Sequence, residues 1–225
     1  SEHSRDRGDG VIPLLHDFAG ETVLVFGGGG VGARKARRFT REARVVVVAP
    51  DFADTDFGGA EFVREAPAPE DVAEWLDRTG PALVVAATDD TALNARIEAD
   101  ARERNVLVNR TDTHGERDPG SVVVPATVRD GDVVVSISTG GSAPALSKHL
   151  REQIEADIEH AGEMAALVGE IRGELQADGV DPSRRRDAVR AVVRDDGVWK
   201  HLGTGGTNAR QRADRVVRDT VGDNT

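Results

Sequence analysis

The sequence predicts an α/β protein with an N-terminal parallel sheet, a small antiparallel β annex and a C-terminal helical domain. Three observations lead to this fold class. β-Branched runs alternate with helical stretches in the first half of the chain, an Asp-Gly turn separates two valine runs near its middle, and apolar residues recur at helical spacing further on. We expect the three parts to span residues 1–113, 114–141 and 142–225.

Five short apolar runs predict the strands of the parallel sheet. The first, Thr22–Phe26, is apolar and closed by glycines, as expected of a strand buried on both faces. Helical segments separate the runs, and strands joined in this way form a parallel sheet with right-handed crossovers. The predicted strands cover residues 22–26, 45–48, 61–63, 83–87 and 106–108, and the predicted helices cover 31–41, 70–76 and 91–104.

A hairpin is predicted in the annex. Val122–Val124 and Val133–Val135 lie on either side of Arg129-Asp130-Gly131-Asp132. An Asp-Gly pair between β runs favours a tight turn whose two central residues both have positive φ. We therefore expect the two valine runs to form the antiparallel annex.

The remainder of the chain is predicted to be helical. Ser142 can cap the first helix, Pro144 suits its first turn, and apolar residues follow at helical spacing at Leu146, Leu150, Ile154 and Ile158. A second helix fits residues 182–194. The last segment, 208–220, is expected to be a weakly apolar helix with a frayed tail, behind a glycine-rich link at 203–206.

Composition argues against several classes of function. Forty acidic residues against 29 basic ones give a net charge of −11, which repels nucleic acid and anionic lipid. Since there is no cysteine, disulfides, thiolate nucleophiles and zinc-thiolate sites are excluded. No apolar run approaches the roughly 20 residues that cross a bilayer, and the polar first residues lack the apolar core of a signal peptide. We expect a cytoplasmic protein without nucleic-acid or membrane partners.

The positive charge is carried almost entirely by arginine, because lysine occurs only at Lys35, Lys148 and Lys200. An acidic surface that is poor in lysine suggests a halophilic host. The alternative is an ordinary solvated acidic face, since high net charge supports solubility in either case.

A glycine-rich turn joins the first predicted strand to the first predicted helix. Gly27, Gly29 and Gly32 satisfy the pattern G-x-G-x-x-G, which is typical of a Rossmann dinucleotide-binding domain when it lies between a strand and a helix. The first glycine permits a tight turn, the second lets the backbone approach a pyrophosphate, and the third allows close helix packing. The alternative is a flexible glycine turn.

Two further positions belong to this predicted cofactor site. Asp51, at the end of the second strand, stands where an acidic residue binds the adenosine ribose, and it favours NAD over NADP. Its alternative is a turn-forming aspartate after Pro50. Thr88 follows the fourth strand, in a Thr-Asp-Asp-Thr segment that we expect mainly to cap the next helix, with cofactor contact as a secondary role.

Several segments together resemble the precorrin-2 dehydrogenase and sirohydrochlorin ferrochelatase family, whose module also forms the N-terminal part of fused siroheme synthases. The resemblance runs from about residue 11 to residue 150, and since no methyltransferase domain follows, the chain resembles the stand-alone form. The segments that carry it are Ile12–Leu14, Val23–Gly29 with Val31–Ala36, Ala86–Asp90 with Asn94, Val108–Asp112 and Ser138–Pro144.

The resemblance implies NAD-dependent oxidation of the tetrapyrrole precorrin-2 to sirohydrochlorin, in some members followed by insertion of ferrous iron. It implies a homodimer, with the β annex and the helical part at the interface. It also implies that Gly30, Val31, Pro50 and Asp51 contact NAD and that Asp112 is the catalytic carboxylate. Thr139 stands where other members carry a serine that can be phosphorylated.

The chemistry of the residues agrees with these roles. Asp112 follows the fifth strand at the carboxyl edge of the sheet, where a base could take the proton that accompanies hydride loss. The alternative is a loop aspartate that caps a turn. The substrate carries many carboxylates, so cations and backbone amides should bind it, and the candidates are Arg110, Arg117, Gly140, Gly141 and Ser142.

His114 could relay a proton or meet incoming iron, but we favour an exposed loop histidine. The other histidines are scattered, so no metal site is predicted. Two other functions stay open. The chain could be a non-catalytic nucleotide-sensing Rossmann module, or a dehydrogenase of a different small substrate.

Overall fold

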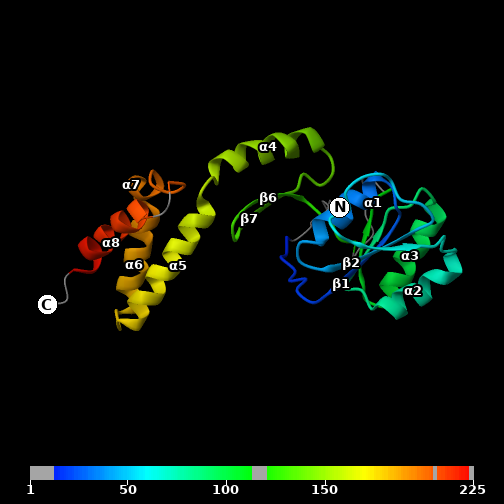
Figure 1. The fold of residues 1–225 in the computed structure, drawn as a ribbon, viewed down its shortest axis with the longest axis horizontal. Helices are drawn as coiled ribbons and strands as arrows, with labels where there is room; N and C mark the ends of the chain where they lie inside the picture. The colour runs from blue at the N-terminus through cyan, green and yellow to red at the C-terminus, as the bar shows by residue number, and fades with distance from the viewer. Residues whose placement is uncertain (1–12, 113–120, 205–206, 223–225) are drawn as a thin grey trace, which may run out of the picture. The chain divides into compact units, whose positions relative to one another are not determined.

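The computed structural model describes residues 13–112, 121–204 and 207–222. It divides into two compact units (Figure 1). The first runs through Val124 and includes Gly140–Ser142, and the second comprises Pro125–Thr139 and the chain from Ala143 onward. Residues 125–139 of the predicted annex therefore share a unit with the helical part, whereas residues 121–124 and 140–141 belong to the unit of the sheet.

The first unit is built on a five-stranded parallel sheet, as the sequence predicts. The strand order is β3-β2-β1-β4-β5, with β1 at Thr22–Phe26, β2 at Arg44–Ala49, β3 at Glu61–Arg64, β4 at Leu83–Ala86 and β5 at Leu107–Arg110. The chain leaves β1 toward β2 on one side and returns to β4 on the other. Such a switch point opens a crevice at the carboxyl ends of the strands, which is where ligands bind in this architecture.

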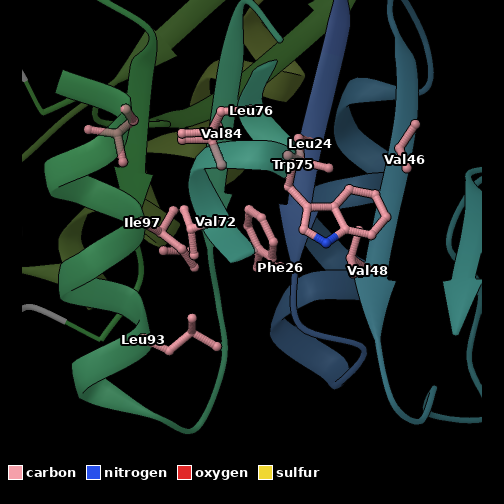
Figure 2. Packing of buried hydrophobic residues seen from close by; sticks show 13 residues of the cluster. Leu24, Phe26, Val46, Val48, Val72, Trp75, Leu76, Val84, Leu93 and Ile97 are labelled. Atoms are coloured by element: carbon pink, nitrogen blue, oxygen red, sulfur yellow. The ribbon is translucent and has the colours of Figure 1, made fainter. Parts of the chain in front are cut away.

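Helices cover both faces of this sheet. On one face, α2 (Val72–Thr79, after a 3₁₀ turn at Pro69–Asp71) and α3 (Thr91–Glu103) pack on alternate strand residues. Figure 2 shows Trp75, Leu76 and Ile97 from these helices around Leu24 and Phe26 of β1. On the other face, α1 (Gly30–Phe39) contributes small alanines. Because both faces are covered, consecutive buried residues of the central strands are apolar, as at Val23–Phe26 of β1 and Val45–Ala49 of β2.

The start of the annex differs from the prediction. Val122–Val124 form no ladder with Val133–Val135; instead Val122 N donates to Val108 O at 2.7 Å, beside β5. The hairpin consists of β6 (Ala126–Asp130) and β7 (Val133–Ile137). At its turn only Gly131 has positive φ, +53°. The run of valines at 122–124 could not show whether it pairs with β5 or with β7, because an apolar segment can lie beside either strand.

The second unit continues in helices: α4 (Pro144–Asp157), α5 (Ala161–Ala177), α6 (Pro182–Val193), α7 (Asp196–Trp199) and α8 (Thr207–Val221). Ala143, not Ser142, is the N-cap of α4, and Pro144 occupies the first turn as expected. None of the helices in the described ranges is both long enough and apolar enough to span a bilayer.

Two helical predictions need correction. The prediction omitted α5, although its buried residues recur every three or four positions, at Met164, Leu167, Ile171 and Leu175. The last helix was expected to fray, yet Ala209, Ala213 and Val221 of α8 are buried in the core that α5 and α6 share. Small alanines gave a weak apolar signal, but they allow close helix packing.

Candidate functional site

The glycine loop is held by backbone contacts that leave no room for a side chain. Gly27 has φ of +119°, and a Cβ there would lie 2.2 Å from the carbonyl oxygen of Ala87. A Cβ on Gly32 would lie 2.0 Å from the oxygen of Gly27. These contacts fit the tight turn and the close packing expected of the first and third glycines. Sequence reasoning missed Gly28, whose Cβ would lie 2.1 Å from Asp51 O.

The middle of the loop is open. A Cβ on Gly29 or Gly30 would meet no atom within 4 Å. Gly29 is the N-cap of α1 and makes no side-chain capping bond, so the first amides of the helix have no intrahelical partner. Val31 beside them is 39% exposed. Bare backbone at a helix N-terminus, next to an exposed apolar residue, fits the pyrophosphate of a dinucleotide.

Asp51 lies next to this loop, as the sequence predicts for a ribose-binding carboxylate. The segment after β2 is tied to the loop, because Ala53 N donates to Gly28 O at 2.8 Å. The Asp51 side chain is 94% exposed, and Arg64 Nη1 lies 3.3 Å from its Oδ1. Pro50 precedes it, and its carbonyl accepts a hydrogen bond from the same nitrogen of Arg64 at 3.2 Å.

The turn after β4 is fixed by a buried asparagine. Asn94, fully buried on α3, donates to Thr88 O at 2.9 Å and accepts from Thr88 Oγ1 at 2.7 Å. Asp90 caps α3 by accepting from the amides of Ala92 and Leu93. Capping by this segment is therefore confirmed. The sequence did not predict that Asn94 anchors this turn. The one indication in the sequence is a polar amide at a helix position where an apolar residue is expected.

Asp112 lies just beyond β5 in a chain of charges. Arg110 Nε and Nη2 donate to its two oxygens at 2.7 and 3.0 Å. Arg110 also donates to Glu98 at 3.2 Å, and Arg102 holds the other Glu98 oxygen at 2.7 Å. The side chains of Arg110, Asp112 and Glu98 are 13, 22 and 10% exposed. A bidentate pair shielded from water in this way orients the carboxylate strongly.

The Arg110 guanidinium lowers the pKa of the Asp112 carboxyl, and a hydrogen bond from Asn94 adds to that effect. Partial burial opposes it. Asp112 is therefore ionised at neutral pH and can accept a proton, although a carboxylate stabilised in this way is a weak base. Arg110 donates four hydrogen bonds inside the protein, two to Asp112, one to Glu98 and one to the carbonyl of Thr91, so a contact with substrate would have to share this guanidinium.

The second predicted substrate segment begins at Gly140. Gly140–Ser142 belong to the first unit, and Gly140 and Gly141 both have positive φ, +63° and +83°. Thr139 Oγ1 lies 2.9 Å from Ser147 Oγ and donates to Ala143 O at 3.2 Å. Substrate contact by this segment stays a prediction.

Arg117 and His114 lie outside the described residues, and their proposed roles stay predictions.

The strand order, the glycine loop at a helix N-terminus and the carboxylate beyond β5 define a Rossmann protein of the dinucleotide-binding class. Two family models match the chain. One, for NAD(P)-binding domains, covers residues 14–126, and the other, for the central region of sirohaem biosynthesis proteins, covers residues 130–157.

The chain is 33% identical over 215 residues to the precorrin-2 dehydrogenase of Methanosarcina barkeri, which covers 92% of this chain and 93% of that protein. It is 36% identical over 214 residues to a siroheme synthase of Pseudomonas putida, and there the match covers 92% of this chain and 44% of that protein. The chain belongs to the precorrin-2 dehydrogenase family.

A solved structure gives the same fold. SirC, a precorrin-2 dehydrogenase, superimposes with a TM-score of 0.68 over 92% of this chain and 98% of that one, at 23% identity. The parallel sheet, the two-stranded annex and the helical part are therefore features of this chain's fold as the sequence predicted them.

We predict that alanine at one glycine of the loop weakens cofactor binding, whereas alanine at another lowers stability. Gly29→Ala should fold normally, because its Cβ meets nothing, but should weaken NAD binding by about tenfold or more, since the methyl group covers open backbone. Gly32→Ala should lower the melting temperature, because its Cβ collides with Gly27 O. Calorimetric titration and thermal melting would measure both, and unchanged NAD affinity in Gly29→Ala would contradict the assignment of the loop.

We also predict that Arg110→Gln destabilises the fold by about 2–3 kcal/mol at pH 7, because it leaves two shielded carboxylates without their shared cation. The folded-state pKa of Asp112 is lowered, so its stabilisation is present at neutral pH and is lost as the pH falls below about 4. The difference between the two proteins should therefore shrink in acid.

Arg44→Gln is the matched control. Arg44 makes a bidentate pair with Glu61 at 2.8 and 2.7 Å, but both side chains are more than half exposed. We expect its removal to cost much less stability than the removal of Arg110, because water screens an exposed ion pair. Urea unfolding across pH 3–8 tests both variants, and equal costs would contradict the buried network.

Proposed function

We propose that this chain oxidises precorrin-2 to sirohydrochlorin with NAD, in sirohaem biosynthesis. The observation that carries the proposal is an ionised carboxylate, Asp112, held at the same sheet edge as an open glycine loop, in a chain that matches a precorrin-2 dehydrogenase over 92% of its length. The backbone connects the two places: Thr111 N donates to Ala86 O, and Ala87 N donates to Phe26 O.

The reaction removes a hydride and a proton from a reduced macrocycle. NAD, when bound, supplies the hydride acceptor. The protein's part is to position the dinucleotide on the bare backbone of Gly29 and Gly30 and to keep a proton acceptor at the neighbouring strand end. Asp112 is that acceptor, and Arg110 keeps both of its oxygens in a defined orientation.

Binding of the substrate's carboxylates requires cations and amides on an acidic protein. Arg110, Arg117 and the amides of Gly140–Ser142 are proposed for this purpose. The two positive φ angles in the Gly140–Ser142 segment support the proposal, because successive turns of this kind expose backbone amides.

Insertion of ferrous iron into sirohydrochlorin is a further step proposed from the family resemblance. Within residues 13–112, 121–204 and 207–222, no three His, Asp or Glu side chains gather closely enough to hold a metal ion. Iron would be a substrate of this step, and we propose Asp112 as the carboxylate that assists its insertion into the bound macrocycle.

A homodimer is proposed on the same grounds. The valines of β7 are only partly buried, and α4 has no buried residue in the single chain. Such surfaces are available for a second copy. Sedimentation equilibrium should give about twice the chain mass of 23.9 kDa.

We predict that Asp112→Asn lowers turnover of precorrin-2 by roughly 10² to 10⁴ while NAD affinity stays near that of the wild type. The amide keeps the shape of the side chain and removes the base. Appearance of the sirohydrochlorin spectrum measures turnover, and titration measures NAD binding. Asp178→Asn, an exposed aspartate at the end of α5, is the control and should change neither.

The outcomes separate the competing functions. Near-normal turnover in Asp112→Asn would contradict the mechanism. NAD binding by the wild type without any oxidation of precorrin-2 would favour the nucleotide-sensing module or another substrate. Parallel loss of iron insertion would indicate one shared site, and His114→Ala should change either activity by less than about tenfold if that histidine is exposed.

We further propose a halophilic origin, and predict that the melting temperature rises between 0.1 and 1 M potassium chloride. The net charge of −11 causes self-repulsion, and the Debye length falls from about 10 to about 3 Å over that range. Differential scanning calorimetry at both concentrations is the test. A melting temperature that stays constant or falls would count against a halophilic protein.

A further inference from the structure

Arg64 lies at the edge of the cofactor site, although sequence reasoning gave it no role. It is the last residue of β3 and pairs in register with Ala49, the last residue of β2. That register brings it beside the turn that carries Pro50 and Asp51. The turn itself contacts the glycine loop through Gly28. Arg64 therefore contacts the turn, and the turn contacts the loop.

The Arg64 guanidinium has a defined position. Nη1 donates to Pro50 O at 3.2 Å and to Asp51 Oδ1 at 3.3 Å. Its carbon lies 5.3 Å from the centre of the Phe52 ring. Phe52 in turn packs on Phe62 and Phe57, with ring centres 4.6 and 5.9 Å away. An aromatic support and two acceptors therefore orient a side chain that is 67% exposed.

The guanidinium retains binding capacity. Both hydrogen bonds of the guanidinium use Nη1, and within the described residues the structure shows no protein acceptor for Nε or Nη2. NADP differs from NAD by a phosphate on the adenosine ribose, the group that a residue at the position of Asp51 meets. Asp51 repels this phosphate, whereas a guanidinium binds phosphate through its planar set of donors.

We propose that Arg64 is a cofactor-specificity residue that attracts the ribose phosphate which Asp51 repels, so that the site prefers NAD but also binds NADP. This inference rests on the proposed function only in placing a dinucleotide at the glycine loop. It assigns opposite effects to two neighbouring side chains, and those effects can be measured by binding alone.

The experiment is calorimetric titration of NAD and NADP into the wild type, Arg64→Gln, Asp51→Asn and the double variant. We expect Arg64→Gln to weaken NADP binding by about tenfold and NAD binding by less than about twofold, because only NADP carries the extra phosphate. Asp51→Asn should strengthen NADP binding by about tenfold, and Arg64→Gln should weaken NADP binding in that background as well. The effects on NADP should diminish in 1 M salt, since both side chains are exposed.

Arg41→Gln is the matched control. Arg41 is exposed and follows the C-terminal end of α1, whereas the glycine loop lies at the N-terminal end of that helix. Arg41→Gln removes the same charge as Arg64→Gln but at a distance from the loop. It should therefore leave the ratio of the NAD and NADP affinities unchanged.

Three results would overturn the inference: equal weakening of both cofactors by Arg64→Gln, the same effect from Arg41→Gln, or an NADP affinity of Asp51→Asn that does not depend on Arg64. These results leave the proposed oxidation of precorrin-2 intact. Conversely, the expected affinities without turnover of precorrin-2 would support the role of Arg64 and refute the proposed function. Failure of the wild type to bind either dinucleotide would refute both.

Discussion

The close backbone packing around the glycine loop is the constraint on which the rest of the site depends. Gly27 touches the turn after β4, Gly28 touches the turn after β2, and Gly32 touches Gly27. The first two contacts join the carboxyl ends of neighbouring strands, and the third brings α1 against the loop, without any side chain between them. Because the strands are parallel and in register, fixing their ends fixes the places of Asp51 and Thr88 around an open helix N-terminus.

A second constraint acts at the other side of the switch point. The charges of Glu98, Arg110 and Asp112 are largely shielded from water, so their mutual hydrogen bonds orient Asp112 strongly and lower its pKa. Orientation and basicity are therefore in opposition: a firmly held carboxylate is ionised at neutral pH but takes up a proton reluctantly. This balance would suit a dehydrogenation, because the macrocycle becomes more acidic as a hydride leaves one of its atoms for the dinucleotide, so that even a weak base can take the proton from another atom.

The ion pair at the predicted cofactor site differs from the Arg110 network because it is exposed to solvent. Asp51 and Arg64 are both exposed, so their attraction is weak and leaves each free to meet a ligand group. In the Arg110 network, similar ion pairs are shielded from water, and they hold the side chains in fixed positions. Solvent exposure, more than residue type, thus separates the arginine assigned to ligand recognition from the arginine that supports a carboxylate.

The sequence by itself determined the parallel sheet, its five strands, the glycine loop and the positions of Asp51 and Asp112 at strand ends. Those features follow from local period and from the shared direction of parallel strands. Tertiary structure alone decided the partner of Val122, the burial of the last helix and the neighbours of Arg64. Their contacts join residues far apart in the chain, and the periodicity of one segment contains no information about what another segment places beside it.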